Sequence, residues 1–169
     1  MPTRCYLAGL DIGFQQDYTV LVICEVFVAP GASRYVPVWI ERLPLPTTAP
    51  QVQQLVGERL GLGTAWQRGR DRALLDVTGA GLPLLHQIQR ERLDVLGVWC
   101  HSGTGSELQK DGRWNVSKQD LIGSVKLVVE QARLQLDPTL PFADTLLHEL
   151  QSYRMTHTTT GQPTYASWN

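Results

Sequence analysis

The fold is decided by the stretch Leu7-Ala8-Gly9-Leu10-Asp11-Ile12-Gly13 and by the run that follows it, Tyr18-Thr19-Val20-Leu21-Val22-Ile23-Cys24. Both stretches are apolar, the second is rich in β-branched residues, and a short polar segment separates them, which predicts a β-hairpin. A turn signal at Pro30-Gly31-Ala32-Ser33 leads into a third extended run from Arg34 to Leu43. Three consecutive strands with short connections predict an antiparallel meander.

After this meander, helical and extended patterns alternate along the chain. Helices are expected over residues 48–60, 82–92, 118–132 and 142–150, and strands over residues 73–77, 94–100 and 134–136. Residues 101–115 are rich in glycine and polar side chains and predict a loop, and residues 153–158 and 164–168 predict a closing hairpin. Alternating strands and helices imply parallel crossovers. We therefore expect one α/β domain over residues 1–169, with an antiparallel meander followed by parallel strands and with helices on both faces of the sheet.

The composition excludes several classes of protein. Hydrophobic residues make up 43% of the 169 residues and charged residues 18%, which argues against disorder. Fifteen basic residues against sixteen acidic ones give a net charge of −1, so a polyanion must be bound by a local patch or through metal ions. No long apolar run predicts a membrane span. The three cysteines are widely spaced in apolar segments and predict reduced core thiols in the cytoplasm.

Asp11 and Asp76 are the candidate catalytic residues. Each follows an apolar strand and precedes a glycine-containing turn, which is where open α/β sheets bind ligands. If the two strands are neighbours, the carboxylates converge and repel each other unless a cation lies between them. Mg²⁺ and Mn²⁺ take such oxygen ligands, and two such ions can promote hydrolysis of a phosphodiester. The ordinary interpretation of either residue alone is a turn former or a helix cap.

Four further residues are candidates for accessory roles. Asp17 and Glu149 are acidic residues that could assist a metal site, although Asp17 also suits a hairpin turn and Glu149 an exposed helix position. Arg113 and Lys118 lie in or beside the glycine-rich segment and are candidates for contacts with a DNA backbone.

These segments together resemble the nuclease domain of tailed-phage terminase large subunits. The resemblance covers residues 7–13 with 17–20, 75–81, 116–121, 146–150 and 161–166, in the order of the family. It implies a ribonuclease-H-like fold that cuts double-stranded DNA with two divalent metals during genome packaging. Asp11 would be the first-strand ligand and Asp76 the second acid. The family's next acid and its final helix have no counterpart before Asn169, which leaves catalytic competence open.

The resemblance also implies a cofactor, partners and a cellular setting. The cofactor would be Mg²⁺ or Mn²⁺, the partners double-stranded DNA and packaging proteins such as the portal and the small terminase, and the setting the cytoplasm of a bacterial host. Two alternatives stay open. One is a degenerate remnant that only binds DNA or a partner. The other is a fragment of an actin-like or sugar-kinase-like ATPase, because such proteins also open with a strand, an Asp-x-Gly turn and a hairpin.

Overall fold

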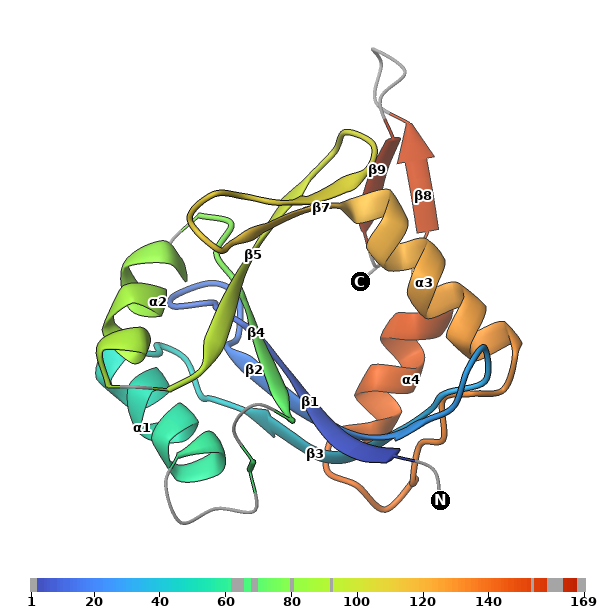
Figure 1. The fold of residues 1–169 in the computed structure, drawn as a ribbon, viewed down its shortest axis with the longest axis horizontal. Coiled ribbons are helices and arrows are strands. Elements are labelled where there is room, and N and C mark those ends of the chain that lie inside the picture. The colour runs from blue at the N-terminus through green and yellow to red at the C-terminus, as the bar shows by residue number, and fades with distance from the viewer. Residues whose placement is uncertain are drawn as a thin grey trace.

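A seven-stranded mixed sheet forms the centre of the molecule (Figure 1). The structure is a computed structural model that describes residues 3–61, 66–67, 70–79, 81–91, 93–152, 154–157 and 163–166. The strand order across the sheet is β3-β2-β1-β4-β5-β7-β6. In chain order the strands are β1 (Thr3–Asp11), β2 (Val20–Val28), β3 (Arg34–Arg42), β4 (Arg72–Asp76), β5 (Val95–His101), β6 (Ser106–Leu108) and β7 (Trp114–Ser117).

The pairing of these strands confirms the predicted topology. β1 pairs with β2 and β2 with β3 in antiparallel fashion, which is the meander. β1 then pairs with β4, β4 with β5, and β5 with β7, all in parallel. Parallel neighbours need a crossover connection, which contains a helix between β1 and β4 and between β4 and β5, and contains the strand β6 between β5 and β7. The carboxyl ends of β1, β4, β5 and β7 therefore lie along one edge of the sheet.

Two helices lie on each side of the sheet, as expected (Figure 1). On one side are α1 (Ala49–Leu60) and α2 (Gly81–Arg90), and on the other are α3 (Lys118–Glu130) and α4 (Ala143–Ser152). α1 begins after Thr48, whose backbone N–H donates to the Gln51 side chain at 2.8 Å. α3 begins after Ser117, whose hydroxyl accepts a hydrogen bond from the Asp120 N–H.

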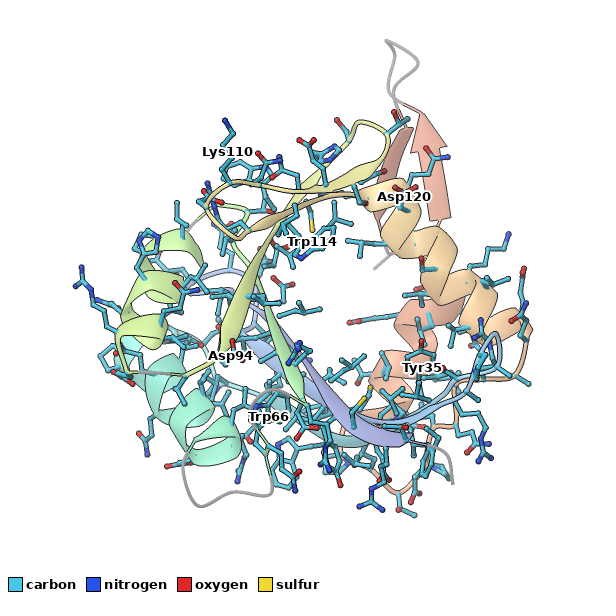
Figure 2. All side chains as sticks on the ribbon, viewed as in Figure 1. Tyr35, Trp66, Asp94, Lys110, Trp114 and Asp120 are labelled. Carbon is cyan, nitrogen blue, oxygen red and sulfur yellow. The ribbon has the colours of Figure 1, made fainter. Side chains whose placement is uncertain are left out.

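The two faces of the sheet are packed very differently. The hydrophobic core fills the side that carries α1 and α2, where Figure 2 shows closely spaced side chains. Its fully buried members include Leu21, Val52, Val56, Leu75, Val77, Leu85 and Ile88. On the other side, α3 has no buried residue and α4 only Ala143. A Cβ built on Gly9, in the middle of β1, would meet no atom within 4 Å. This second face is therefore open.

Residues 101–115 differ from the prediction of a loop. β5 extends to His101, and β6 and β7 form an antiparallel hairpin that widens the sheet. The segment is polar and rich in glycine, but Trp114 and Val116 pair with the strand β5 and gain their extended conformation from that tertiary contact. The short strand expected at residues 134–136 is reduced to a single bridge between Leu134 and Tyr35.

The closing hairpin is present as a separate two-stranded sheet. β8 (Arg154–His157) pairs with β9 (Pro163–Ala166) in antiparallel fashion. The segment between these two strands lies outside the described residues. Within the described part of the chain, no helix has the length and apolar character needed to cross a membrane.

Candidate functional site

Asp11 and Asp76 lie side by side at the carboxyl ends of β1 and β4. The last paired residues of these strands are Leu10 and Leu75, and the two aspartates directly follow them. Adjacent strands are separated by about 4.8 Å, so the backbones of Asp11 and Asp76 are close neighbours. Leu10 and Leu75 are buried in the core, 5% and 0% exposed. Because successive side chains alternate, both aspartates belong to the open second face.

The electrostatic environment of Asp11 shows that the two carboxylates interact. The pKa of the Asp11 carboxyl group is raised, first because surrounding protein replaces bulk water and next because the Asp76 carboxylate is near. Asp17 acts in the same direction, whereas a hydrogen bond with the Ile12 backbone and the charge of Lys118 oppose it. Two hard oxygen ligands that repel each other suit a divalent cation, which would relieve the repulsion.

Asp76 also acts as a turn former. Its Oδ1 accepts a hydrogen bond of 2.7 Å from the Thr78 N–H, and the Thr78 hydroxyl accepts one of 3.0 Å from the Cys100 N–H. These bonds tie the end of β4 to the end of β5 and set the orientation of the Asp76 carboxylate. Burial, followed by the Asp76 charge, raises the pKa of the Cys100 thiol to about 11, so Cys100 stays protonated beside Asp76.

The turn that follows Asp11 is held by a buried threonine. The Thr19 hydroxyl donates to the Gly13 carbonyl at 2.6 Å and accepts from the Gly13 N–H at 3.2 Å. A Cβ at Gly13 would collide with the backbone of Asp17, so glycine permits the close approach that places Asp17 near Asp11. Gly13 thus allows two parts of the chain's own backbone to pack closely.

Asp17 and Glu149 share one cavity with Asp11. This cavity has a volume of about 550 Å³ and lies on the second face, with α4 contributing Glu149. It is also lined by Gln16, Tyr18, Val20, Val22, Ile40, Arg42, Phe142, Thr145 and Leu146. In the described part of the chain, however, no three His, Cys, Asp or Glu residues are grouped closely enough to hold a metal ion. Asp11 and Asp76 form a pair of potential ligands, and Asp17 and Glu149 extend the acidic surface around Asp11.

The two basic candidates lie in different places. Lys118 is the first residue of α3, and its charge acts on both Asp11 and Cys100. Arg113 donates to Asp111 at 2.6 and 2.8 Å, and its Cγ lies 3.2 Å from the Cβ position of Gly97, a buried residue of β5. The structure therefore brings Lys118, and not Arg113, to the pair of aspartates.

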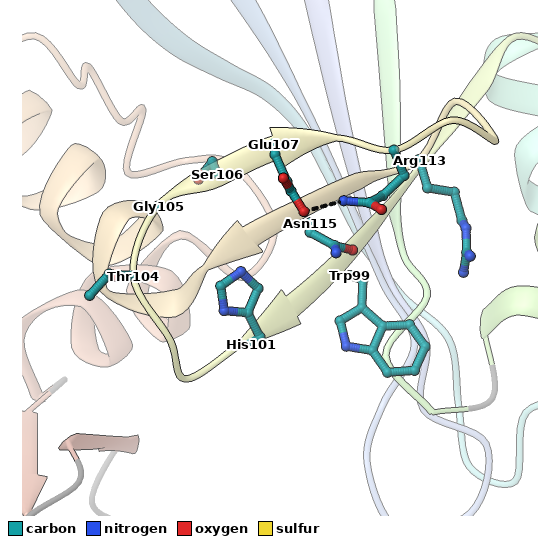
Figure 3. A pocket seen from close by; sticks show the side chains of 9 residues that line it. Trp99, His101, Thr104, Gly105, Ser106, Glu107, Arg113 and Asn115 are labelled. Atoms are coloured by element: carbon teal, nitrogen blue, oxygen red, sulfur yellow. Dashed lines mark hydrogen bonds between the residues drawn. The ribbon is translucent and has the colours of Figure 1, made fainter.

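A second cavity, of about 730 Å³, lies on the opposite face of β5 (Figure 3). Trp99, His101 and Asn115 line it, and the Gln109 side chain donates a hydrogen bond to Glu107. Since side chains alternate along β5, Trp99 points away from the face that carries Cys100 and Asp76. The carboxylate pair, rather than this larger cavity, holds the chemically distinctive groups.

Three aromatic and basic side chains on the second face were not among the candidate site residues chosen from the sequence. Trp114 is 38% exposed and pairs with Val98, the partner of Asp76, and Figure 2 shows it on the inner side of β7. Tyr18 and Arg42 line the cavity of Asp11. The alternation of β3 and β7 would have found Arg42 and Trp114 once the strand pairing was known.

Comparison with known proteins identifies the fold. No family model and no curated protein matches the sequence. The nuclease domain of the large terminase from bacteriophage P22 matches with a TM-score of 0.59 at 12% identity, over 97% of this chain and 74% of that one. The large terminase (g2p) nuclease domain of bacteriophage SPP1, solved with bound Mn, matches with a TM-score of 0.55 at 12% identity, over 94% and 74%.

The chain has the fold of a terminase nuclease domain. This ribonuclease-H-like fold was the one expected from the ordered set of motifs. Both matches extend over most of the chain.

Proposed function

We propose that this domain hydrolyses phosphodiester bonds in DNA with Mg²⁺ or Mn²⁺, as a nuclease of the terminase large-subunit type. The observation that carries the proposal is the pair Asp11 and Asp76 at the ends of neighbouring parallel strands, in a domain with the fold of terminase nuclease domains. The proposed unit is a single domain spanning residues 1–169. Its proposed setting is the cytoplasm of a bacterial host, where the portal and the small terminase would be partners.

Each of the residues at this site would have a separate role in such a reaction. Asp11 and Asp76 would hold the metal, which supplies a Lewis acid for phosphate oxygens and promotes attack by water. Asp76 is kept in orientation by the Thr78 N–H. Lys118 lowers the cost of the clustered negative charge and offers a contact for a phosphate. In the net reaction water adds across one P–O bond, leaving a phosphate on one side of the cut and a hydroxyl on the other.

Nicking of supercoiled plasmid in Mn²⁺ tests the proposal. We expect Asp11→Asn and Asp76→Asn to lose more than about 100-fold in rate, because even outer partners of a metal site contribute 10- to 100-fold. Asp94→Asn is the matched control, since Asp94 is exposed and precedes β5 at the opposite edge of the sheet. Wild-type protein that leaves the plasmid intact, or aspartate variants that cut as well as Asp94→Asn, would refute the proposal.

A second candidate function is binding of DNA without cleavage. It is favoured by one observation, that the described residues contain no group of three potential metal ligands. It predicts a gel shift of DNA that persists in Asp11→Asn, together with intact plasmid in Mn²⁺. The matched structures are nuclease domains, so they offer no support to the ATPase alternative. Calorimetric titration with ATP would show binding only if that alternative holds.

A further inference from the structure

An arginine without a carboxylate partner stands in the cavity of Asp11. The guanidinium carbon of Arg42 lies 3.3 Å from the centre of the Tyr18 ring, and both side chains line the cavity. Within the described part of the chain Arg42 makes no ion pair, although Asp17 and Glu149 line the same cavity. A guanidinium stacked on an aromatic ring keeps its N–H donors in its own plane, parallel to the ring, where they are available to a further group.

The register of the meander places Arg42 and Asp11 in one row across the sheet. Arg42 is paired with Val20, and Val20 is paired with Asp11. Directly opposed residues of neighbouring strands share a face, so all three side chains belong to the open second face. Two strand spacings separate Arg42 from Asp11, which is about 10 Å between their backbones. Among the described residues that line the cavity, Arg42 is the one with a permanent positive charge.

We propose that Arg42, held flat against Tyr18, binds a phosphate of the DNA backbone beside the phosphate that reaches Asp11 and Asp76. This inference rests on the proposed action on DNA. The distance of about 10 Å between Arg42 and Asp11 exceeds the axial rise of about 3.4 Å per nucleotide on one strand, so the two residues would contact different phosphates. The planar fork of arginine suits two oxygens of a phosphate, and stacking on Tyr18 limits the freedom lost on binding.

The charge of the chain explains why such a contact is needed. The net charge of −1 gives no general attraction for DNA, and Asp11, Asp17 and Glu149 repel phosphates from the cavity. A bound divalent cation would offset the charge at Asp11. Arg42 offsets the negative charge of the cavity on the side formed by β2 and β3, and Lys118 supplies a positive charge at the start of α3. DNA would thus meet positive charge on both sides of the acidic residues.

Fluorescence anisotropy with a short labelled DNA duplex in Ca²⁺ tests this contact. The affinity is measured between about 50 and 200 mM salt, where each phosphate contact contributes about 0.9 to the slope of log K against log salt. We expect Arg42→Ala to make the slope shallower by about 0.9. The ratio of wild-type to Arg42→Ala affinity should then fall about 3.5-fold as the salt rises from about 50 to 200 mM. Arg42→Lys keeps the charge and the slope, and Tyr18→Leu weakens binding while retaining the slope.

Arg34→Ala is the matched control. Arg34 begins the same strand, stacks on Phe27 at 5.4 Å and lies outside the cavity. We expect this variant to bind DNA as the wild type does. An unchanged slope in Arg42→Ala, or an equal change in Arg34→Ala, would overturn the assignment. The recovery of the slope in Arg42→Lys separates a charge contact from a loss of folding.

The plasmid assay keeps the two proposals apart. A wild-type protein that shows the slope dependent on Arg42 but fails to nick plasmid in Mn²⁺ refutes the nuclease proposal and supports the phosphate contact. A wild-type protein that nicks plasmid while Arg42→Ala retains the full slope supports the nuclease and refutes the contact. A wild-type protein that binds no DNA refutes both.

Discussion

Two glycines in neighbouring parts of the sheet offer a direct test of its two faces. Gly97 of β5 and Gly9 of β1 both lie within strands, and neither has a positive φ, so alanine introduces no backbone strain at either position. A Cβ at Gly97 would lie 2.6 Å from Leu85 Cδ2, 3.2 Å from Arg113 Cγ and 3.3 Å from Val77 Cγ1. A Cβ at Gly9 would meet nothing within 4 Å.

The expected effects of these substitutions on stability have opposite signs. Leu85 and Val77 are 2% and 0% exposed, so neither can move aside without disturbing the core, and overpacking of this kind costs about 1–3 kcal/mol. Replacing glycine by alanine within a strand recovers about 0.5–1 kcal/mol of conformational entropy. We therefore expect Gly97→Ala to lower the free energy of unfolding by about 1–2 kcal/mol and Gly9→Ala to leave it unchanged or to raise it by about 0.5 kcal/mol.

Urea unfolding followed by circular dichroism measures both effects. At constant slope, the midpoint should fall for Gly97→Ala and stay or rise for Gly9→Ala. In thermal unfolding, the loss in Gly97→Ala corresponds to about 2–8 °C for a chain of this size. If Gly9→Ala is destabilised as much as Gly97→Ala, the second face is packed. That result would refute the conclusion that the second face is open beside Asp11.

Three further predictions concern single side chains. Asp71 is buried, and burial by itself raises the pKa of its carboxyl group. Hydrogen bonds from two backbone N–H groups outweigh this effect, so the pKa is lowered overall. Asp71→Asn should therefore cost about 2 kcal/mol in urea unfolding at neutral pH, and this difference should vanish as the pH falls from about 4 through the lowered pKa. Thr19→Val removes both hydrogen bonds to Gly13 and should cost about 1–2 kcal/mol in the same assay, with weaker Mn²⁺ binding in calorimetry. Asp76→Asn should lower the pKa of Cys100 from about 11 and so speed its alkylation by iodoacetamide, read by mass spectrometry, whereas an unchanged rate would show that the two groups do not interact.

Much of the fold could be predicted from local sequence because its signals are short in range. Alternating apolar runs mark the meander, and Thr48 and Ser117 mark the starts of two helices. The hairpin of β6 and β7 could not be predicted in this way, because its polar residues become strands only by pairing with β5. Glycine-rich composition describes the turns of that hairpin and hides the short strands between them.

The residues of the candidate site likewise fall into those that local sequence identifies and those that depend on strand pairing. Asp11 and Asp76 could be found because each follows an apolar strand, and their adjacency needed only the assumption that β1 and β4 are neighbours. Arg42 and Trp114 gave no local signal, since an arginine or a tryptophan in a strand is common on any surface. Their position beside the aspartates depends on pairing across β2 and across β5, which is a property of the assembled sheet.

The position of the aspartates follows from the packing of the core. Leu10 and Leu75 are held on the face of α1 and α2 by burial, so the residues that follow them must face the other way. A shift of β1 by one residue would place Asp11 in the core and Leu10 in the cavity, and an unpaired buried carboxylate costs several kcal/mol. The same apolar contacts that stabilise the sheet therefore hold the two carboxylates together. A site built in this way requires its own face of the sheet to remain uncovered, as it is around Gly9.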